Sequence, residues 1–170
     1  RAKLSWPADD GVGGGARQRA LGAPVPPVAV LLTTGAMNPP HRGHAAMLHA
    51  AATRLRAAGY HVAGAYLSPS HDGYVQPKAQ SLHTPGLSAP FRLAVARAAV
   101  RDDPLVSVAA WEAQKPGRWP DFPVVVDALR AELRDGPPCS VFYVCGTDHA
   151  DRCGLWRGMG PGRGLVVVPR

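Results

Sequence analysis

The stretch that decides the fold is Val-Ala-Val-Leu-Leu-Thr-Thr at residues 28–34, followed by Gly-Ala-Met-Asn-Pro-Pro-His-Arg-Gly-His at residues 35–44. The first seven residues form a short apolar run, which is typical of a strand buried on both faces of a sheet. The next ten hold two glycines and two prolines, which predicts a turn that opens a helix. A strand, a turn and a helix in this order begin an α/β fold.

The rest of the chain repeats this alternation. We expect helices at residues 42–58, 90–101 and 121–134, and further strands at residues 61–67, 105–110, 140–145 and 165–168. Residues 68–87 are polar and rich in Pro and Gly, so we expect a long functional loop there. The pattern predicts a Rossmann-like parallel sheet with helices on both faces. In such sheets ligands bind at the carboxyl ends of the strands, near the switch in strand order.

Composition bounds the domain organisation. The chain has 170 residues, enough for one domain. Residues 1–27 are rich in Gly and Pro and predict a leader or linker, and residues 28–170 predict the single α/β domain. Since the first residue is Arg1 rather than Met, we expect a fragment of a longer protein. No run approaches eighteen apolar residues, so we expect no membrane span.

The net charge of +7 raises the question of nucleic-acid binding. Sixteen of the nineteen basic residues are arginines, and they are scattered without aromatic interleaving. This distribution disfavours a surface that binds nucleic-acid strands. A few of these arginines could equally well bind a small anionic substrate.

Three cysteines, Cys139, Cys145 and Cys153, show neither CxxC nor zinc-ligand spacing. An odd, sparse set fits an intracellular, reducing compartment, and we expect all three to be small buried hydrophobes. The sequence does not distinguish cytoplasm, nucleus and organelle.

The turn after the first strand contains the two histidines that make it a candidate functional site. His41 and His44 are three residues apart, so at a helix start they project to the same side. The positive end of the helix dipole and its unpaired N–H groups lie there, which together describe an anion site. Two surface histidines beside a turn are the alternative. No third ligand lies close in sequence, so we expect no protein-held metal.

In this context the segment resembles the H-x-G-H signature of the nucleotidyltransferase superfamily. Reading on, the chain resembles the nicotinamide/nicotinate mononucleotide adenylyltransferases of eukaryotic type through six landmarks in register. They are Gly35 to Pro39 with His44, Ser68 to Tyr74, Trp111-Glu112 followed by Trp119, Cys145 to Asp148, Leu155-Trp156, and Gly164 to Arg170.

The resemblance implies transfer of AMP from ATP to nicotinamide or nicotinate mononucleotide, with Mg²⁺ held mainly by the ATP phosphates. It implies that His44, helped by His41, is catalytic and binds phosphate. The same resemblance implies ATP contacts from Gly35, Ala36, Gly146, Asp148 and Arg170, and mononucleotide contacts from Trp119, Leu155, Trp156 and Lys78.

Three departures from the family pattern keep an alternative open. The family has Lys one or two residues after the tyrosine of its second landmark, whereas here the nearest lysine is Lys78, behind Pro77. The family's His-Arg is Phe91-Arg92, and its usual Thr after the second Trp is Phe122.

The family's closing S-S-T-x-[IL]-R motif does not follow within the chain, so we expect a domain truncated at its C-terminus. The alternative is a non-catalytic relative kept as a structural or interaction module of a larger assembly. A sister transferase with a different acceptor is a further reading. Subunit number, whether a homo-oligomer or a subunit of an assembly, stays open.

Overall fold

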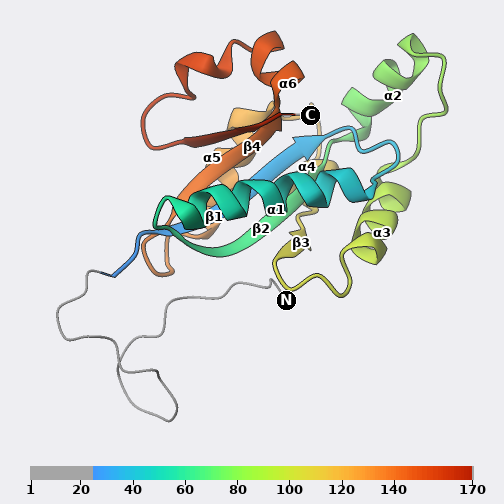
Figure 1. The fold of residues 1–170 in the computed structure, drawn as a ribbon. Helices are drawn as coiled ribbons and strands as arrows, with labels where there is room; N and C mark the ends of the chain where they lie inside the picture. Colours follow the sequence, from blue (N-terminus) through green and yellow to red (C-terminus); the bar gives the residue numbers. More distant parts are fainter. Residues whose placement is uncertain (1–24, 170) are drawn as a thin grey trace.

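The computed structural model describes residues 25–169 of the chain (Figure 1). The strands are β1 (Val28–Gly35), β2 (His61–Pro69), β3 (Val106–Val108), β4 (Ser140–Gly146) and β5 (Gly164–Val168). The helices are α1 (Arg42–Ala57), α2 (Asp72–Ser81), α3 (Ala89–Ala99), α4 (Trp111–Gln114), α5 (Phe122–Glu132) and α6 (Thr147–Arg152), with a short 3₁₀ helix, η1, at Leu155–Arg157.

The strands form one sheet in the order β3-β2-β1-β4-β5, and every pairing is parallel. The chain moves from β1 outward to β3 and then returns to the other side of β1 with β4. The order therefore reverses between β1 and β4, which is where a doubly wound sheet opens a crevice at its carboxyl end. The predicted Rossmann-like parallel sheet is confirmed.

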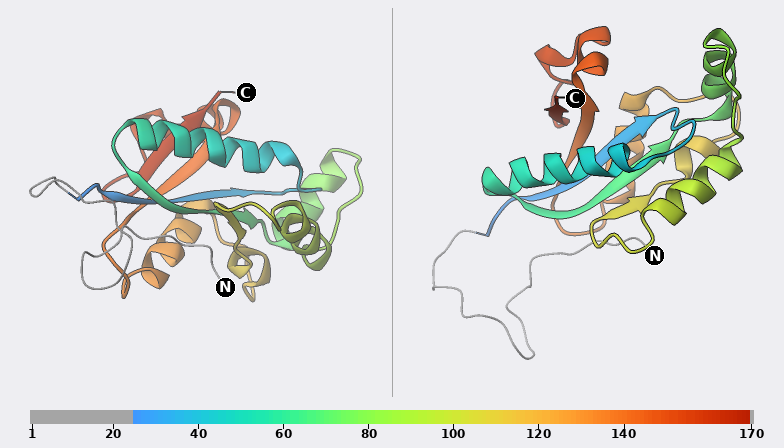
Figure 2. Two further views of the ribbon diagram at one scale, coloured as in Figure 1. Left: turned by 60° about the horizontal axis from the view of Figure 1, so that its bottom comes forward. Right: turned by 45° about the vertical axis from the view of Figure 1, so that its right-hand side comes forward.

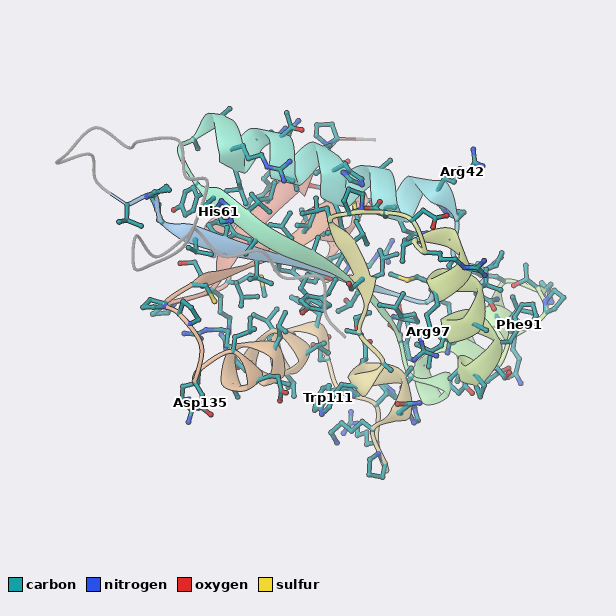
Figure 3. All side chains as sticks on the ribbon, turned by 90° about the horizontal axis from the view of Figure 1, so that it is seen from below. Arg42, His61, Phe91, Arg97, Trp111 and Asp135 are labelled. Carbon is teal, nitrogen blue, oxygen red and sulfur yellow. The ribbon has the colours of Figure 1, made fainter. Side chains whose placement is uncertain are left out.

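Helices cover both faces of this sheet. The apolar side of α1, Met47, Leu48, Ala51, Ala52 and Leu55, packs on one face, where Ala29 and Leu31 of β1 project. Val125 and Val126 of α5 pack on the opposite face with Val30 and Leu32. Figure 2 shows the sheet between α1 and α5, and Figure 3 shows side chains filling the space between these layers. Residues 28–32 of β1 are buried throughout, as a continuous apolar run requires.

Two expectations need correction. Residues 68–87 are not one loop, because residues 72–81 form α2 despite the internal Pro77. The side chain of His71 caps this helix by accepting a hydrogen bond from Gly73 N–H, and Val75 and Ala79 bury its inner side. The third strand is shorter than predicted, since β3 ends at Val108 and Ala110 already caps α4.

Most of the predicted leader, residues 1–24, lies outside the described residues. Arg170 also lies outside them. Among residues 25–169 no helix is both long and apolar enough to cross a membrane.

Candidate active site at the carboxyl ends of the strands

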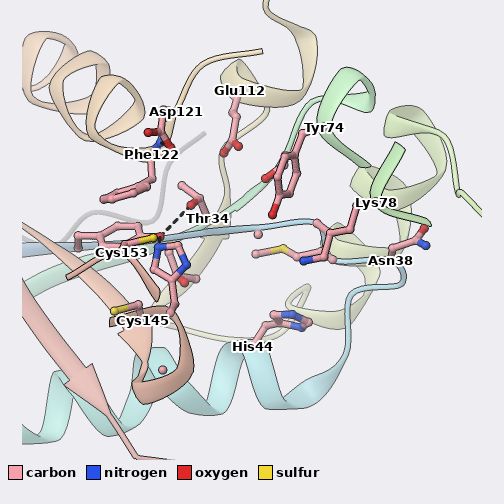
Figure 4. A pocket seen from close by; sticks show the side chains of 18 of the residues that line it. Thr34, Asn38, His44, Tyr74, Lys78, Glu112, Asp121, Phe122, Cys145 and Cys153 are labelled. Atoms are coloured by element: carbon pink, nitrogen blue, oxygen red, sulfur yellow. Dashed lines mark hydrogen bonds between the residues drawn. The ribbon is translucent and has the colours of Figure 1, made fainter. Parts of the chain in front are cut away.

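A cavity of about 540 Å³ opens at the carboxyl ends of β1 and β4, at the switch in strand order. Its wall comes from the turn after β1, the first turn of α1, helix α2, the segment between α4 and α5, and helix α6. Figure 4 shows His44, Lys78 and Asn38 at one end of the cavity, and Phe122, Cys145 and Cys153 at the other. The segments that follow β1, β2, β3 and β4 therefore converge on one site, whereas no described residue after β5 lines it.

The two histidines of the turn face each other, with ring centroids 3.9 Å apart. His41 is the N-cap of α1, and its Nδ1 accepts a hydrogen bond from Gly43 N–H at 3.2 Å. In return, His44 Nδ1 accepts from His41 N–H at 3.1 Å, which completes a capping box built from imidazoles. Nδ1 of His44 also lies 3.3 Å from the His41 carbonyl oxygen, but a backbone N–H can only donate, so Nδ1 is the acceptor in the bond from His41 N–H.

This cap fixes the orientation of both rings. Because each Nδ1 accepts a backbone hydrogen bond, the ring N–H donor of His41 and of His44 lies at Nε2. Both residues line the cavity beside Gly35 and Ala36. A helix N-terminus and two imidazoles thus act on the same volume, which suits an anion.

Helix α2 brings a positive charge to this end of the cavity. Lys78 lies one helical turn after Tyr74, and its Nζ is 5.5 Å from the centre of the Tyr74 ring. The Tyr74 ring in turn contacts Trp119, with centroids 5.3 Å apart. All three residues line the cavity. Lys78 therefore reaches the site from within a helix, although Pro77 precedes it.

The other end of the cavity is aromatic and carries a hydrogen-bonded chain. Phe122 stacks on Tyr143 with centroids 4.9 Å apart and meets His149 edge-on. The Tyr143 hydroxyl is 3.0 Å from Thr34 Oγ1 and 3.3 Å from His149 Nε2. Burial lowers the pKa of His149, and the charge of Arg152 lowers it further. A flat ring would find both stacking surface and a polar edge here.

Glu112 is a buried carboxyl group in the cavity wall. Its side chain is 3% exposed and accepts a hydrogen bond from Ser68 Oγ at 2.6 Å. Burial raises the pKa of Glu112 to about 7, although hydrogen bonds from Ser68 and Ser70 and the charge of Arg92 oppose the shift. This carboxyl group therefore titrates near neutral pH inside the site.

The structure brings most of the predicted site residues together. The cavity wall includes Gly35, Ala36, His41, His44, Lys78, Trp119, Gly146 and Asp148. Leu155 lies instead in the core cluster that also contains Val125 and Val126 of α5, and it is 6% exposed. Trp156 is 61% exposed and donates from Nε1 to Asp151 at 2.6 Å, outside the residues found to line the cavity.

Several lining residues were not predicted as site residues. Tyr143 lies inside an apolar strand, and the sequence carries no signal for its role at the floor of the cavity. Glu112 belongs to the Trp111-Glu112 landmark and follows β3, so both features were available signals for it. Cys153 is exposed and lines the cavity, so the expectation that all three cysteines are buried is wrong for this one.

A family model described as cytidylyltransferase-like matches residues 32–170, which includes every residue of the cavity described above. The chain belongs to this cytidylyltransferase-like family. Two curated relatives are named nicotinamide/nicotinic acid mononucleotide adenylyltransferase. The protein from Oryza sativa subsp. japonica is 36% identical over 125 residues, covering 71% of this chain and 47% of the relative. The protein from Arabidopsis thaliana is 38% identical over 86 residues, covering 51% of this chain and 33% of the relative.

The resemblance drawn from the six landmarks is thereby confirmed, and the chain spans about half or less of the length of these relatives. In this cytidylyltransferase-like domain the two ends of the cavity carry different kinds of side chain. Imidazoles, a helix N-terminus and a lysine gather at one end, and aromatic rings gather at the other. Such a cavity can hold a polyphosphate beside a ring-bearing second substrate.

Proposed function

We propose that the protein transfers the AMP portion of ATP to nicotinamide or nicotinate mononucleotide, giving the dinucleotide and pyrophosphate. The observation that carries this proposal is the pair of facing imidazoles, His41 and His44, on a helix N-terminus in a cavity that also holds Lys78. The names of both curated relatives support it.

In the proposed reaction, a phosphate oxygen of the mononucleotide attacks the α-phosphorus of ATP and the bond to the β-phosphate oxygen breaks. The pyrophosphate leaves with the electron pair of that bond, and no covalent enzyme intermediate forms. Catalysis then consists of positioning and of neutralising charge on the transferred group. His44, helped by His41, donates to the phosphates from Nε2, and Lys78 adds a positive charge.

The remaining lining residues suit the nucleosides. Trp119, with Phe122, offers aromatic surface for the pyridine ring, and a cationic ring is attracted to such faces. Asp148 is exposed in the wall next to Gly146 and can accept hydrogen bonds from sugar hydroxyls. Leu155, Trp156 and Arg170 stay predictions from the resemblance.

We expect a divalent cation, Mg²⁺, to enter with the ATP phosphates. Within residues 25–169 no group of three His, Cys, Asp or Glu side chains is placed to hold a metal ion. A hydrated cation that stays on its phosphates needs no such set of protein ligands. This cation would neutralise phosphate charge.

A non-catalytic module is the competing proposal. It is disfavoured because the imidazole pair, the lysine and the aromatic end all remain assembled on one cavity. A sister transferase with another acceptor predicts that phosphopantetheine or sugar phosphates compete with the mononucleotides. We also propose that the protein works in a reducing compartment, and three free cysteines support this.

The test is to incubate the intact protein with ATP, Mg²⁺ and nicotinamide mononucleotide, and in parallel with nicotinate mononucleotide, and to follow dinucleotide and pyrophosphate. Equal amounts of both products support the proposal. Pyrophosphate without dinucleotide points to another acceptor, and neither product in any arm overturns the activity.

For His44→Ala we expect turnover to fall ~100- to 1000-fold, since one donor to the developing charge is lost. The matched control is His83→Asn, which removes an exposed imidazole and tolerates the left-handed backbone at that residue. Turnover of the His44 variant at the wild-type rate would remove His44 from the mechanism.

A further inference from the structure

Arg92 of α3 is completely buried, and it is not among the residues that line the cavity. Its guanidinium donates four hydrogen bonds to three separate segments of the chain. Nε donates to the Leu87 carbonyl at 2.9 Å and Nη1 to the Ala36 carbonyl at 2.9 Å. Nη2 donates at 2.7 Å both to the Ser70 carbonyl and to Asp72 Oδ1.

Two of these segments build the phosphate end of the cavity. Ala36 lies in the turn after β1 and lines the cavity, and Ser70, which directly follows β2, lines it too. Asp72 is the first residue of α2, the helix that carries Lys78. One planar group therefore connects the turn in front of the histidine pair with the helix that supplies the lysine.

The peptide geometry shows what Arg92 controls. The peptide that joins Ala36 to Met37 is planar and trans, so its C=O and N–H point in opposite directions. Because the carbonyl points at Arg92, the N–H of Met37 points away from it, and both residues joined by this peptide line the cavity. Holding the carbonyl therefore fixes the direction of a backbone donor at the phosphate end.

The stability of the fold alone does not explain why an arginine occupies this buried position. Removing a charge from water is costly, and an apolar residue of similar volume commonly serves the stability of a fold as well or better. The distinctive property of arginine is its rigid planar fork, which holds several acceptors in a fixed geometry. Lysine has the same charge without that fork.

We propose that Arg92 is a positioning residue that orients the Ala36–Met37 peptide for phosphate binding and couples it to α2. Its consequence for catalysis rests on the proposed function, whereas its effect on the turn does not. Arg92 acts through the backbone of the turn and touches no substrate.

The test compares Arg92→Lys with Arg97→Lys, which changes an exposed arginine of the same helix. Amide hydrogen exchange is followed in the turn, residues 35–38, and in the buried strand β2. For Arg92→Lys we expect amide exchange in the turn to accelerate about tenfold while β2 stays protected. The reason is that losing one hydrogen bond to a charged group shifts a local opening equilibrium by about this factor. We expect KM for ATP to rise and kcat to fall ~10- to 100-fold.

Equal acceleration in the turn and in β2, or no change in the turn, would overturn the positioning role. If the lysine variant does not fold, Asp72→Asn removes the anionic partner of Arg92 and is expected to change the turn in the same direction by a smaller factor. An unchanged turn in that variant counts against the proposal. If the wild type transfers no AMP, the proposed function fails, and the exchange measurement still decides the role of Arg92.

Discussion

At the start of α1, His41 takes the N-cap position usual for Ser, Thr, Asp or Asn, and His44 takes the N3 position usual for Glu or Gln in a capping box. Their Nδ1 atoms satisfy backbone N–H groups, and this leaves the donor of each ring at Nε2. The spacing of three residues predicted that both rings project to one side, and the distance of 3.9 Å between their centroids confirms it. Their reciprocal cap could not be predicted, because imidazoles seldom serve as caps.

Glu112 gives a pH dependence at the residue scale. Its pKa is about 7 in the folded protein, against 4.5 for the ordinary group, because burial disfavours the carboxylate. The folded state therefore keeps a proton that the unfolded state has lost, so the free energy of unfolding falls as pH rises from about 4.5 to about 7. The loss assigned to this group is on the order of 3 kcal/mol.

Glu112→Gln should abolish this contribution, since the amide does not titrate. Urea unfolding at pH 5 and pH 7.5 measures it: we expect the wild type to lose more stability than the variant between the two pH values. Parallel losses in the two proteins would show that Glu112 does not titrate in this range.

Among the elements, α2 shows where sequence patterns fail. Its segment contains Gly73 and Pro77, and apolar side chains do not recur along it, so a loop was the expectation. The helix forms because tertiary contacts outweigh propensity: Asp72 accepts from Arg92 and from Ala89 N–H, while Val75 and Ala79 are buried. The central strands could be predicted without knowledge of tertiary contacts, since their apolar runs already specify burial on both faces.

The position of Lys78 on α2 carries its own prediction. Lys78→Ala should raise KM for ATP about tenfold or more, because a phosphate contact at this end of the cavity is lost. Lys115→Ala, at a lysine outside the residues that line the cavity, is the control. Steady-state kinetics with varied ATP measures both, and an unchanged KM in the Lys78 variant would show that the lysine does not reach the nucleotide.

For the whole molecule, the alternation of strands and helices predicted the sheet, its parallel pairing and the edge where the site lies. It could not predict which side chains from separate loops meet. Phe122, Tyr143 and His149 come from three elements, and their contacts depend on how α5 and α6 pack on the sheet. Such packing has no local sequence signal.

Ligand binding should appear in the stability of the whole domain. With Mg²⁺ present, ATP at a hundred times its Kd is expected to stabilise the protein by about 2.7 kcal/mol, because it binds the folded state alone. Thermal unfolding measures this, with a single-stranded oligonucleotide as the comparison. Stabilisation by the oligonucleotide that weakens steeply with salt would instead indicate a nucleic-acid surface.

The measurement closest to the central claim is a titration of the intact protein with ATP while the imidazole ¹⁵N resonances are followed by NMR. We predict that the Nε2 signals of His41 and His44 move together and saturate at one ATP per chain, while the signal of His83, on an exposed loop, stays in place. If ATP binds and neither signal moves, the polyphosphate lies elsewhere and the account of this site is wrong.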